Sequence, residues 1–211
     1  MRPGGLPNAL HNAGVNPIPS CVDAREAALA LLLHRHSTGP KHLRKPGPTD
    51  ADVLRIAQAA LRAPDHGRKI PFRFAVIRGA AKGRLGDLFE AYGRRRGKPD
   101  DEVAAERDRA ERPPVVIAVI ARIVDDEEVP AHEQWMAVGG AVANAMNALQ
   151  LMGYAGKMLS GARAADPAIA GAFCAPGETL VGWIAAGIAA LPPKPREPDE
   201  PAARVSRWPA E

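Results

Sequence analysis

The sequence has 211 residues, of which 46% are hydrophobic and 4% aromatic, which is enough for one domain with a core of small aliphatic side chains. Its net charge of +4 comes from interleaved basic and acidic residues, without the aromatic-rich basic stripe or recognition helix of a nucleic-acid-binding protein. The two cysteines, Cys21 and Cys174, lack metal-ligand spacing, which argues against a disulfide framework and against a structural zinc site.

The two ends of the chain differ in composition from the middle. Residues 1–20 are rich in Gly, Pro and Asn and are predicted to be a flexible arm. They contain no apolar segment of signal-peptide length, so a cytoplasmic location is expected. Residues 192–211 form a proline-rich tail that we expect to pack on the domain or on a partner. The domain itself is predicted to span 21–191.

Two helices are predicted in the first third of the chain. A leucine-rich helix spans 23–34, and an amphipathic helix spans 49–61, where Thr49 and Asp52 have the spacing of a capping box. The segment between the two helices, 35–48, is rich in Lys, Arg, Gly and Pro and is predicted to be a loop.

Three apolar segments are predicted to be strands. The alternating segment 72–79 borders the core, whereas the continuous apolar runs 113–124 and 179–187 are typical of buried strands. Between the first two strands, 85–92 has one apolar helical face, and 94–112 is dense in mixed charge, which is typical of a solvated helix. The remaining predicted elements are an extended segment over 154–161 and a short helix over 166–173.

The stretch that organises the chain is 133–153, which reads EQWMAVGGAVANAMNALQLMG. It is uncharged over 134–152 and rich in helix formers, so a long helix is predicted. The length would suffice for a membrane span, but Asn144, Asn147 and Gln150 would each need a polar partner in lipid. We therefore interpret it as a central helix, apolar on all sides and buried by its own subunit and by a second copy.

The order of these elements favours an α+β layer fold, because helices outnumber the strands and separate them without a strict βαβ rhythm. No GxGxxG motif follows a strand, which argues against a Rossmann nucleotide site, and no GxSxG motif marks a hydrolase nucleophile. The histidines form no recognisable metal-ligand set.

Two short segments carry polar groups that could bind a ligand. Arg35 and Ser37, separated by His36, could hold a phosphate, although cations in a last helical turn are also common without any ligand. Arg62 and His66 lie on a rigid proline-containing segment that could equally be a plain connection. Neither segment decides the function by itself.

In chain order, LLLHRHS, ALRAPDHGRKIPFRFAVIRG, the small-residue helix, GYAGKMLSG and GIAALPPKPREP resemble the nitroreductase family of FMN-dependent oxidoreductases. The resemblance spans roughly 23–198 and is closest to a short branch with an RRS-type start and an APDH loop. It implies an α+β homodimer with a central mixed sheet, a long buried helix at the interface, and two FMN sites shared between the subunits. NADH or NADPH would be the reductant.

The resemblance also assigns residues to FMN by their positions. Arg35, His36 and Ser37, together with Lys194 and Arg196 of the tail, correspond to the segments that bind the phosphate and ribityl chain. The other assigned residues lie beside the flavin ring or come from the partner subunit: Arg62, His66, Ile70, Met158, Leu159 and Ser160. No metal and no side-chain nucleophile are implied, because the flavin carries the chemistry.

Several of these positions depart from the family pattern. His36 stands in place of a second arginine, Ile70 in place of a glutamine, Phe72 in place of a tryptophan, and Met158 and Leu159 in place of a Trp-Arg pair. The pocket is therefore expected to be more apolar, which leaves the acceptor and the nicotinamide preference open.

The leading hypothesis is an FMN-dependent oxidoreductase that passes hydride from NAD(P)H through flavin N5 to a nitroaromatic, quinone-like or related electrophile. Neither a nucleic-acid partner nor a membrane partner is expected. The alternative is a flavin-free binding module that keeps the dimer fold, since the changed ring-side residues could reflect lost redox function.

Overall fold

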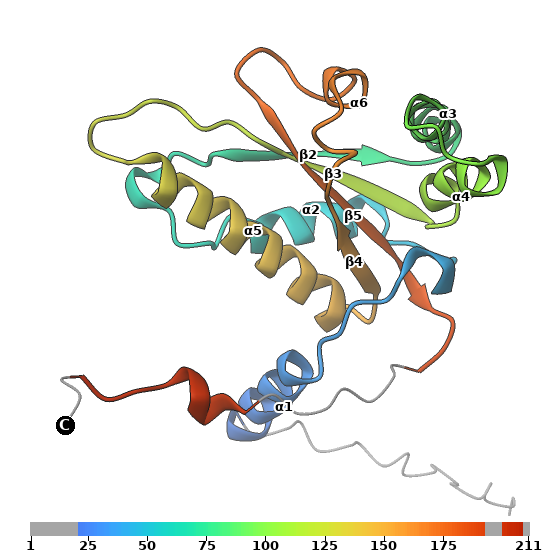
Figure 1. Cartoon of the computed structure of the whole chain (residues 1–211). Helices are drawn as coiled ribbons and strands as arrows, with labels where there is room; N and C mark the ends of the chain where they lie inside the picture. The colour runs from blue at the N-terminus through green and yellow to red at the C-terminus, as the bar shows by residue number, and fades with distance from the viewer. Residues whose placement is uncertain (1–20, 193–199, 209–211) are drawn as a thin grey trace, which may run out of the picture.

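The computed structural model describes residues 21–192 and 200–208. A central sheet carries helices on both of its faces (Figure 1), which confirms the predicted α+β class. The helices in chain order are α1 (Cys21–Leu33), α2 (Asp50–Ala60), α3 (Ala80–Arg95), α4 (Asp100–Glu111), α5 (Ala131–Leu151) and α6 (Pro167–Gly171). Short 3-10 turns lie at Pro40–His42 (η1), His66–Arg68 (η2) and Pro201–Arg204 (η3).

The sheet is built around β5. Its strands are β1 (Leu43–Arg44), β2 (Phe72–Ile77), β3 (Val115–Ala121), β4 (Ala155–Leu159) and β5 (Thr179–Ala189). Strand β3 lies between β2 and β5, while β1 and β4 pair end to end with the other side of β5. The two-residue strand β1 lies in the segment that the sequence predicted to be a loop, because strands this short leave no periodic pattern.

Every pairing among these described strands is antiparallel, so the expected mixed sheet is wrong for this part of the chain. The connections explain the result. The helix pair α3–α4 returns the chain to the end of the sheet where β2 finished, so β3 starts beside the end of β2 and runs antiparallel to it. The single helix α5 makes β4 run in the same direction as β3, but β5 lies between these two strands and runs against both.

Strand β3 divides the core into two layers. All seven of its residues are buried, as the continuous apolar run predicts. Val115, Ile117 and Val119 pack with α2 and α5, whereas Val116 and Ile120 pack with α3 and α6. The alternation of side chains along a strand therefore assigns each helix to one face of the sheet.

Helix α2 starts as predicted. The hydroxyl of Thr49 accepts a hydrogen bond from the backbone N–H of Asp52 at 3.1 Å, and the N–H of Thr49 donates to the Asp52 carboxylate at 2.9 Å. The same carboxylate accepts a hydrogen bond from the Tyr154 hydroxyl at 2.8 Å. The bond from the Thr49 N–H is the main cause that lowers the pKa of Asp52. The capping box thus also fixes the start of α2 to Tyr154, the residue before β4.

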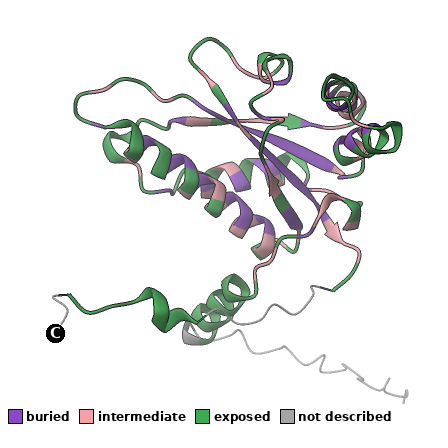
Figure 2. Cartoon of the chain, viewed as in Figure 1, coloured by how far each residue is buried: buried purple, intermediate pink, exposed green. Residues whose placement is uncertain are grey.

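The described residues of the chain cover helix α5 on one face only. The buried face contacts the sheet and α2 through small and aliphatic residues, namely Ala137, Val138, Ala141, Ala145 and Leu149. The opposite face is exposed (Figure 2) and includes Trp135, Met136, Gly139, Ala143 and Leu151. The described part of the chain therefore buries one face of α5, and burial of the other face by a second copy stays a prediction. Among the described helices, none is long and apolar enough to cross a membrane.

Helix α1 and the segment 200–208 lie away from the sheet (Figure 1). Helix α1 exposes its leucines, including Leu29 at 49% and Leu33 at 75%. Every described residue from Glu200 to Trp208 is exposed (Figure 2), so packing of the tail on a partner stays a prediction. The expected flexible arm, 1–20, and the two tail cations, Lys194 and Arg196, lie outside the described residues.

Candidate functional site

The segment predicted to bind phosphate lies beside the start of β4. Arg35, His36 and Ser37 follow α1, and the backbone N–H of the next residue, Thr38, donates to the carbonyl of Gly156 at 2.9 Å. This bond attaches the segment to the sheet. A cavity of about 270 Å³ opens here, lined by His36, Ser37, Thr38, Gly39, His42, Leu191 and Pro192.

The donors around this cavity suit an oxyanion. The described residues that line it include no carboxylate, and the hydroxyl of Ser37 and the imidazoles of His36 and His42 can each donate a hydrogen bond. The guanidinium of Arg35, immediately before the cavity, has no acceptor within 21–192 or 200–208. A guanidinium beside further hydrogen-bond donors is a typical environment for a phosphate.

The residues predicted to lie beside the flavin ring end β4. Met158 packs on the α2–α5 layer of the core, whereas Leu159 packs with Leu43 and Ala155 on the opposite side of the strand. A flat ring bound on one face of β4 would therefore contact one of these two side chains. Gly182 of β5 allows this end of β4 to approach, because its φ is +147° and a Cβ there would collide with the carbonyl oxygen of Leu159.

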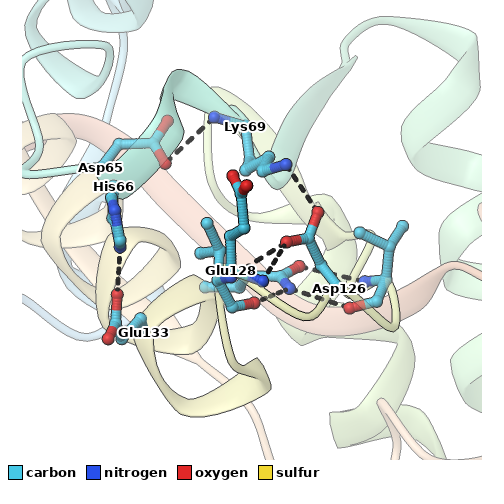
Figure 3. A network of polar contacts seen from close by, with 9 residues as sticks. Asp65, His66, Lys69, Asp126, Glu128 and Glu133 are labelled. Atoms are coloured by element: carbon cyan, nitrogen blue, oxygen red, sulfur yellow. Dashed lines mark hydrogen bonds and ion pairs between the residues drawn. The ribbon is translucent and has the colours of Figure 1, made fainter.

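The second predicted segment follows α2, where Arg62 is exposed and His66 starts η2. The Nδ1 atom of His66 donates to the carboxylate of Glu133 on α5 at 2.8 Å, with 61% of the His66 side chain exposed (Figure 3). Arg68 and Ile70 have positive φ angles of 53° and 47°. Non-glycine residues rarely adopt this conformation, and such strain is concentrated at functional loops.

A network of polar contacts holds this strained loop (Figure 3). The carboxylate of Asp65 accepts hydrogen bonds from the backbone N–H groups of Lys69 at 3.2 Å and Ile70 at 2.8 Å. The amine of Lys69 donates to Asp126 at 2.6 Å, which raises the pKa of Lys69 and lowers that of Asp126. Asp65 therefore stabilises the loop backbone and does not form an acid/base pair with its neighbour His66.

The segment before α5 completes this support. The side-chain amide of Gln134, 1% exposed, accepts from the backbone N–H of Val124 at 3.0 Å and donates to the carbonyls of Val124 and Val129, both at 2.8 Å. Asp126 also accepts from the N–H of Val129 at 2.9 Å. The start of α5, the connection from β3 and the loop of Ile70 are thus one hydrogen-bonded unit.

The two predicted binding segments lie at opposite ends of α5. His66 contacts Glu133 near the first turn, whereas the segment around Arg35 contacts β4, which follows the last turn. Leu151 lies 18 positions after Glu133, so at a rise of about 1.5 Å per residue the two segments are separated by about 27 Å along the helix axis. A single described chain does not bring Arg62 and His66 to Arg35, His36 and Ser37.

Sequence reasoning missed two residues that shape these segments. Glu133 is 67 positions from His66, and nothing in the local sequence links them. Gly182 did leave a signal, because an isolated glycine inside a continuous apolar strand indicates a bulge or a close backbone approach.

A family model described as the nitroreductase family matches residues 32–188 of this chain. The chain is 33% identical over 161 residues to the Escherichia coli (strain K12) protein named "Putative NAD(P)H nitroreductase YdjA". The matched region covers 76% of this chain and 87% of that protein.

Solved structures share the fold. A nitroreductase-like family protein from Bacillus cereus superposes with a TM-score of 0.71 at 16% identity, over 87% of this chain and 96% of the other. A point mutant of NfnB, described as an FMN- and NADPH-dependent nitroreductase from sphigopyxis sp. strain HMH, superposes with a TM-score of 0.65 at 18% identity, over 86% and 98% of the two chains.

Proposed function

The chain belongs to the nitroreductase family. We propose that it is an FMN-dependent oxidoreductase that uses NAD(P)H to reduce a small electrophile. The single observation that supports this function best is the cavity beside Ser37, which has phosphate-binding donors and adjoins the β4 segment expected at the flavin ring. Bound FMN would accept hydride from the nicotinamide and pass it to the acceptor.

The residues fit the cofactor. Arg35, His36 and Ser37 would bind the FMN phosphate, with Lys194 and Arg196 of the tail as additional cations. Met158 or Leu159 would pack against the ring, and Ser160 follows at the end of β4. Arg62, His66 and Ile70 would complete the site from the partner subunit, because they lie about 27 Å away along α5 in the same chain.

A homodimer explains this separation. Two copies of α5 related by a two-fold axis and packed antiparallel would place the His66 end of one helix beside the Arg35 end of the other. The exposed stripe of Met136, Gly139 and Ala143 is apolar and small enough for such a close approach. The exposed leucines of α1 would also be covered in an obligate interface of this kind.

The expected acceptor is a flat and weakly polar molecule such as a nitroaromatic or a quinone. Ile70 and Phe72 line a small cavity of about 140 Å³ at the end of the sheet. Its nearest charged pair is neutralised, because Arg73 donates to Glu178 at 2.5–2.7 Å and lowers the pKa of that carboxyl to about 2. The cavity is lined on its apolar side by Ile70, Phe72 and Ile120 and on its charged side by Arg73, Arg122 and Glu178. The apolar side chains would favour planar electrophiles without selecting one of them.

The experiment is purification without added flavin, followed by light scattering and FMN titration. A yellow dimer that releases FMN on heating is expected. The variant Arg35→Ala should weaken FMN binding by about 1.5–3 kcal/mol, the range for a hydrogen bond to a charged group. Arg96→Ala is the matched control, because Arg96 is exposed and lies at the end of α3, which packs on the other sheet face.

Two results would contradict the proposal. A colourless protein that takes up no FMN would favour the flavin-free binding module. A monomer at low micromolar concentration that still binds FMN tightly would mean that the site is not shared between subunits. Reduction of nitrobenzene and of benzoquinone with NADH and with NADPH then identifies the acceptor class and the reductant.

A further inference from the structure

A second polar cavity lies on the opposite face of the sheet from α5. It has a volume of about 320 Å³ and opens between α3, α4 and the segment 160–164. Its polar lining consists of Tyr92, Lys98, Glu106, Arg109, Ser160 and Arg163. Of these residues, Ser160 is the one already assigned to the flavin site, so the cavity adjoins the expected reaction centre.

The cavity is built around a buried carboxylate. Glu106 on α4 is 1% exposed and receives Lys98 Nζ at 2.6 Å, Arg109 Nη1 at 2.7 Å, and Arg163 Nη1. Burial alone would raise the pKa of Glu106, but the bonds from Lys98 and Arg163 outweigh burial and lower it. Glu106 is therefore an anion, and the lining carries three positive charges against one negative charge.

The excess charge comes with unused donors. Arg109 and Arg163 each use one terminal nitrogen on Glu106, and their other N–H groups have no acceptor within the described residues. The Arg163 guanidinium also lies over the Phe89 ring, 5.2 Å from its centroid, which orients it. Glu102, the further carboxylate at 3.8 Å from Lys98, does not line the cavity. Against the two carboxylates Glu102 and Glu106, the three cations leave one positive charge, together with the unused N–H groups of Arg109 and Arg163.

We propose that this cavity binds the anionic group, a phosphate or a carboxylate, of the small molecule that exchanges electrons at the flavin site. Planar guanidinium groups with free paired N–H donors recognise such oxyanions. The anion would belong either to the NADPH phosphate or to a carboxylated acceptor. The link to electron transfer rests on the function proposed above, whereas anion binding itself does not.

The test is a calorimetric titration of inorganic phosphate into the FMN-saturated full chain and two variants. Arg109→Gln removes one guanidinium that has unused N–H groups, while Lys98 and Arg163 still neutralise Glu106. Arg112→Gln is the control, because Arg112 lies three residues later, pairs with Asp108 at 2.5 Å, and does not line the cavity. Arg109→Gln should weaken phosphate binding by about tenfold or more, and Arg112→Gln should leave it unchanged.

Equal phosphate affinities in the two variants, or no phosphate binding by the FMN-saturated wild type, would overturn the proposal. If the chain binds no FMN, the comparison of the two variants still tests anion binding, so the two failures can be told apart.

Steady-state kinetics then identifies the source of the anion. A higher KM in Arg109→Gln for NADPH but not for NADH assigns the cavity to the reductant. A higher KM for 4-nitrobenzoate but not for neutral nitrobenzene assigns it to the acceptor. No change in any of these KM values overturns the assignment to a substrate.

Discussion

Helices α4 and α5 differ in composition, and in each of them the burial differs from what the composition suggests. Helix α4, DDEVAAERDRAE, is among the most charged stretches of the chain, yet it buries Glu106 completely against α3 and the segment of Arg163. Helix α5 is uncharged over 134–151, yet it exposes Met136 and Ala143 along one face. Hydropathy alone therefore misjudges both helices.

The difference has a physical cause in each helix. A carboxylate can be buried in α4 because three cations from different segments neutralise it, and such pairing is invisible to a local pattern. An apolar face can be exposed in α5 because its cover would come from another molecule. The buried carboxylate of α4 is neutralised within its own chain, whereas we propose that a second copy of the chain covers the apolar face of α5.

The largest expected effect comes from a charge on the buried face of α5. Ala145 is 0% exposed and contacts the sheet of its own chain, so Ala145→Asp places an unpaired carboxylate in the core. It should destabilise the fold by more than about 4 kcal/mol and yield insoluble protein. Solubility and the urea midpoint measure this effect. Ala143→Asp, on the exposed face, is the matched control and should stay soluble.

The next largest effect is expected at the buried carboxylate of α4. Glu106→Gln leaves Lys98, Arg109 and Arg163 without their shared anion and should lower the free energy of unfolding by about 3 kcal/mol. The control Glu111→Gln removes a surface pair with Arg107 and should change the free energy of unfolding by about 0–1 kcal/mol. Urea unfolding of both variants provides the measurement. Equal urea midpoints of the two variants would mean that the buried ion pairs of Glu106 stabilise the fold no more than the surface pair of Glu111.

These effects show what the sequence could and could not predict. The helices and the long strands were predictable because each repeats one pattern over many residues, and the capping box of Thr49 and Asp52 was predictable from its spacing. The resemblance predicts that the segment around Arg35 binds phosphate, which stays a prediction, and the contact of this segment with Gly156 required the fold. The partners of Glu106 lie up to 57 residues away, so no local pattern reveals them.

A smaller effect is expected in acid. The pKa of Glu106 is lowered in the folded chain, so its pairing contributes stability above the pKa of an unfolded glutamate, and this contribution is lost as the pH falls through the folded value. The free energy of unfolding should therefore decrease below about pH 4.5 in the wild type, and less steeply in Glu106→Gln. Urea unfolding from pH 7 to pH 3 measures both slopes. Identical slopes would indicate that other carboxylates dominate the acid response.

The smallest effect on the fold is expected at Ala143, which makes it the sharpest test of the exposed face of α5. Because Ala143 is exposed, Ala143→Asp should change the stability of the single chain by no more than about 0.5 kcal/mol. If that face pairs with a second copy, however, each dimer gains two facing carboxylates in an apolar interface. The variant should therefore be folded by circular dichroism but monomeric by light scattering, and it should lose FMN because Arg62 and His66 no longer reach the partner's site. Ala91→Asp, an exposed helical alanine on the other side of the sheet, should remain dimeric and yellow. A dimeric, FMN-bound Ala143→Asp would place the interface on another surface.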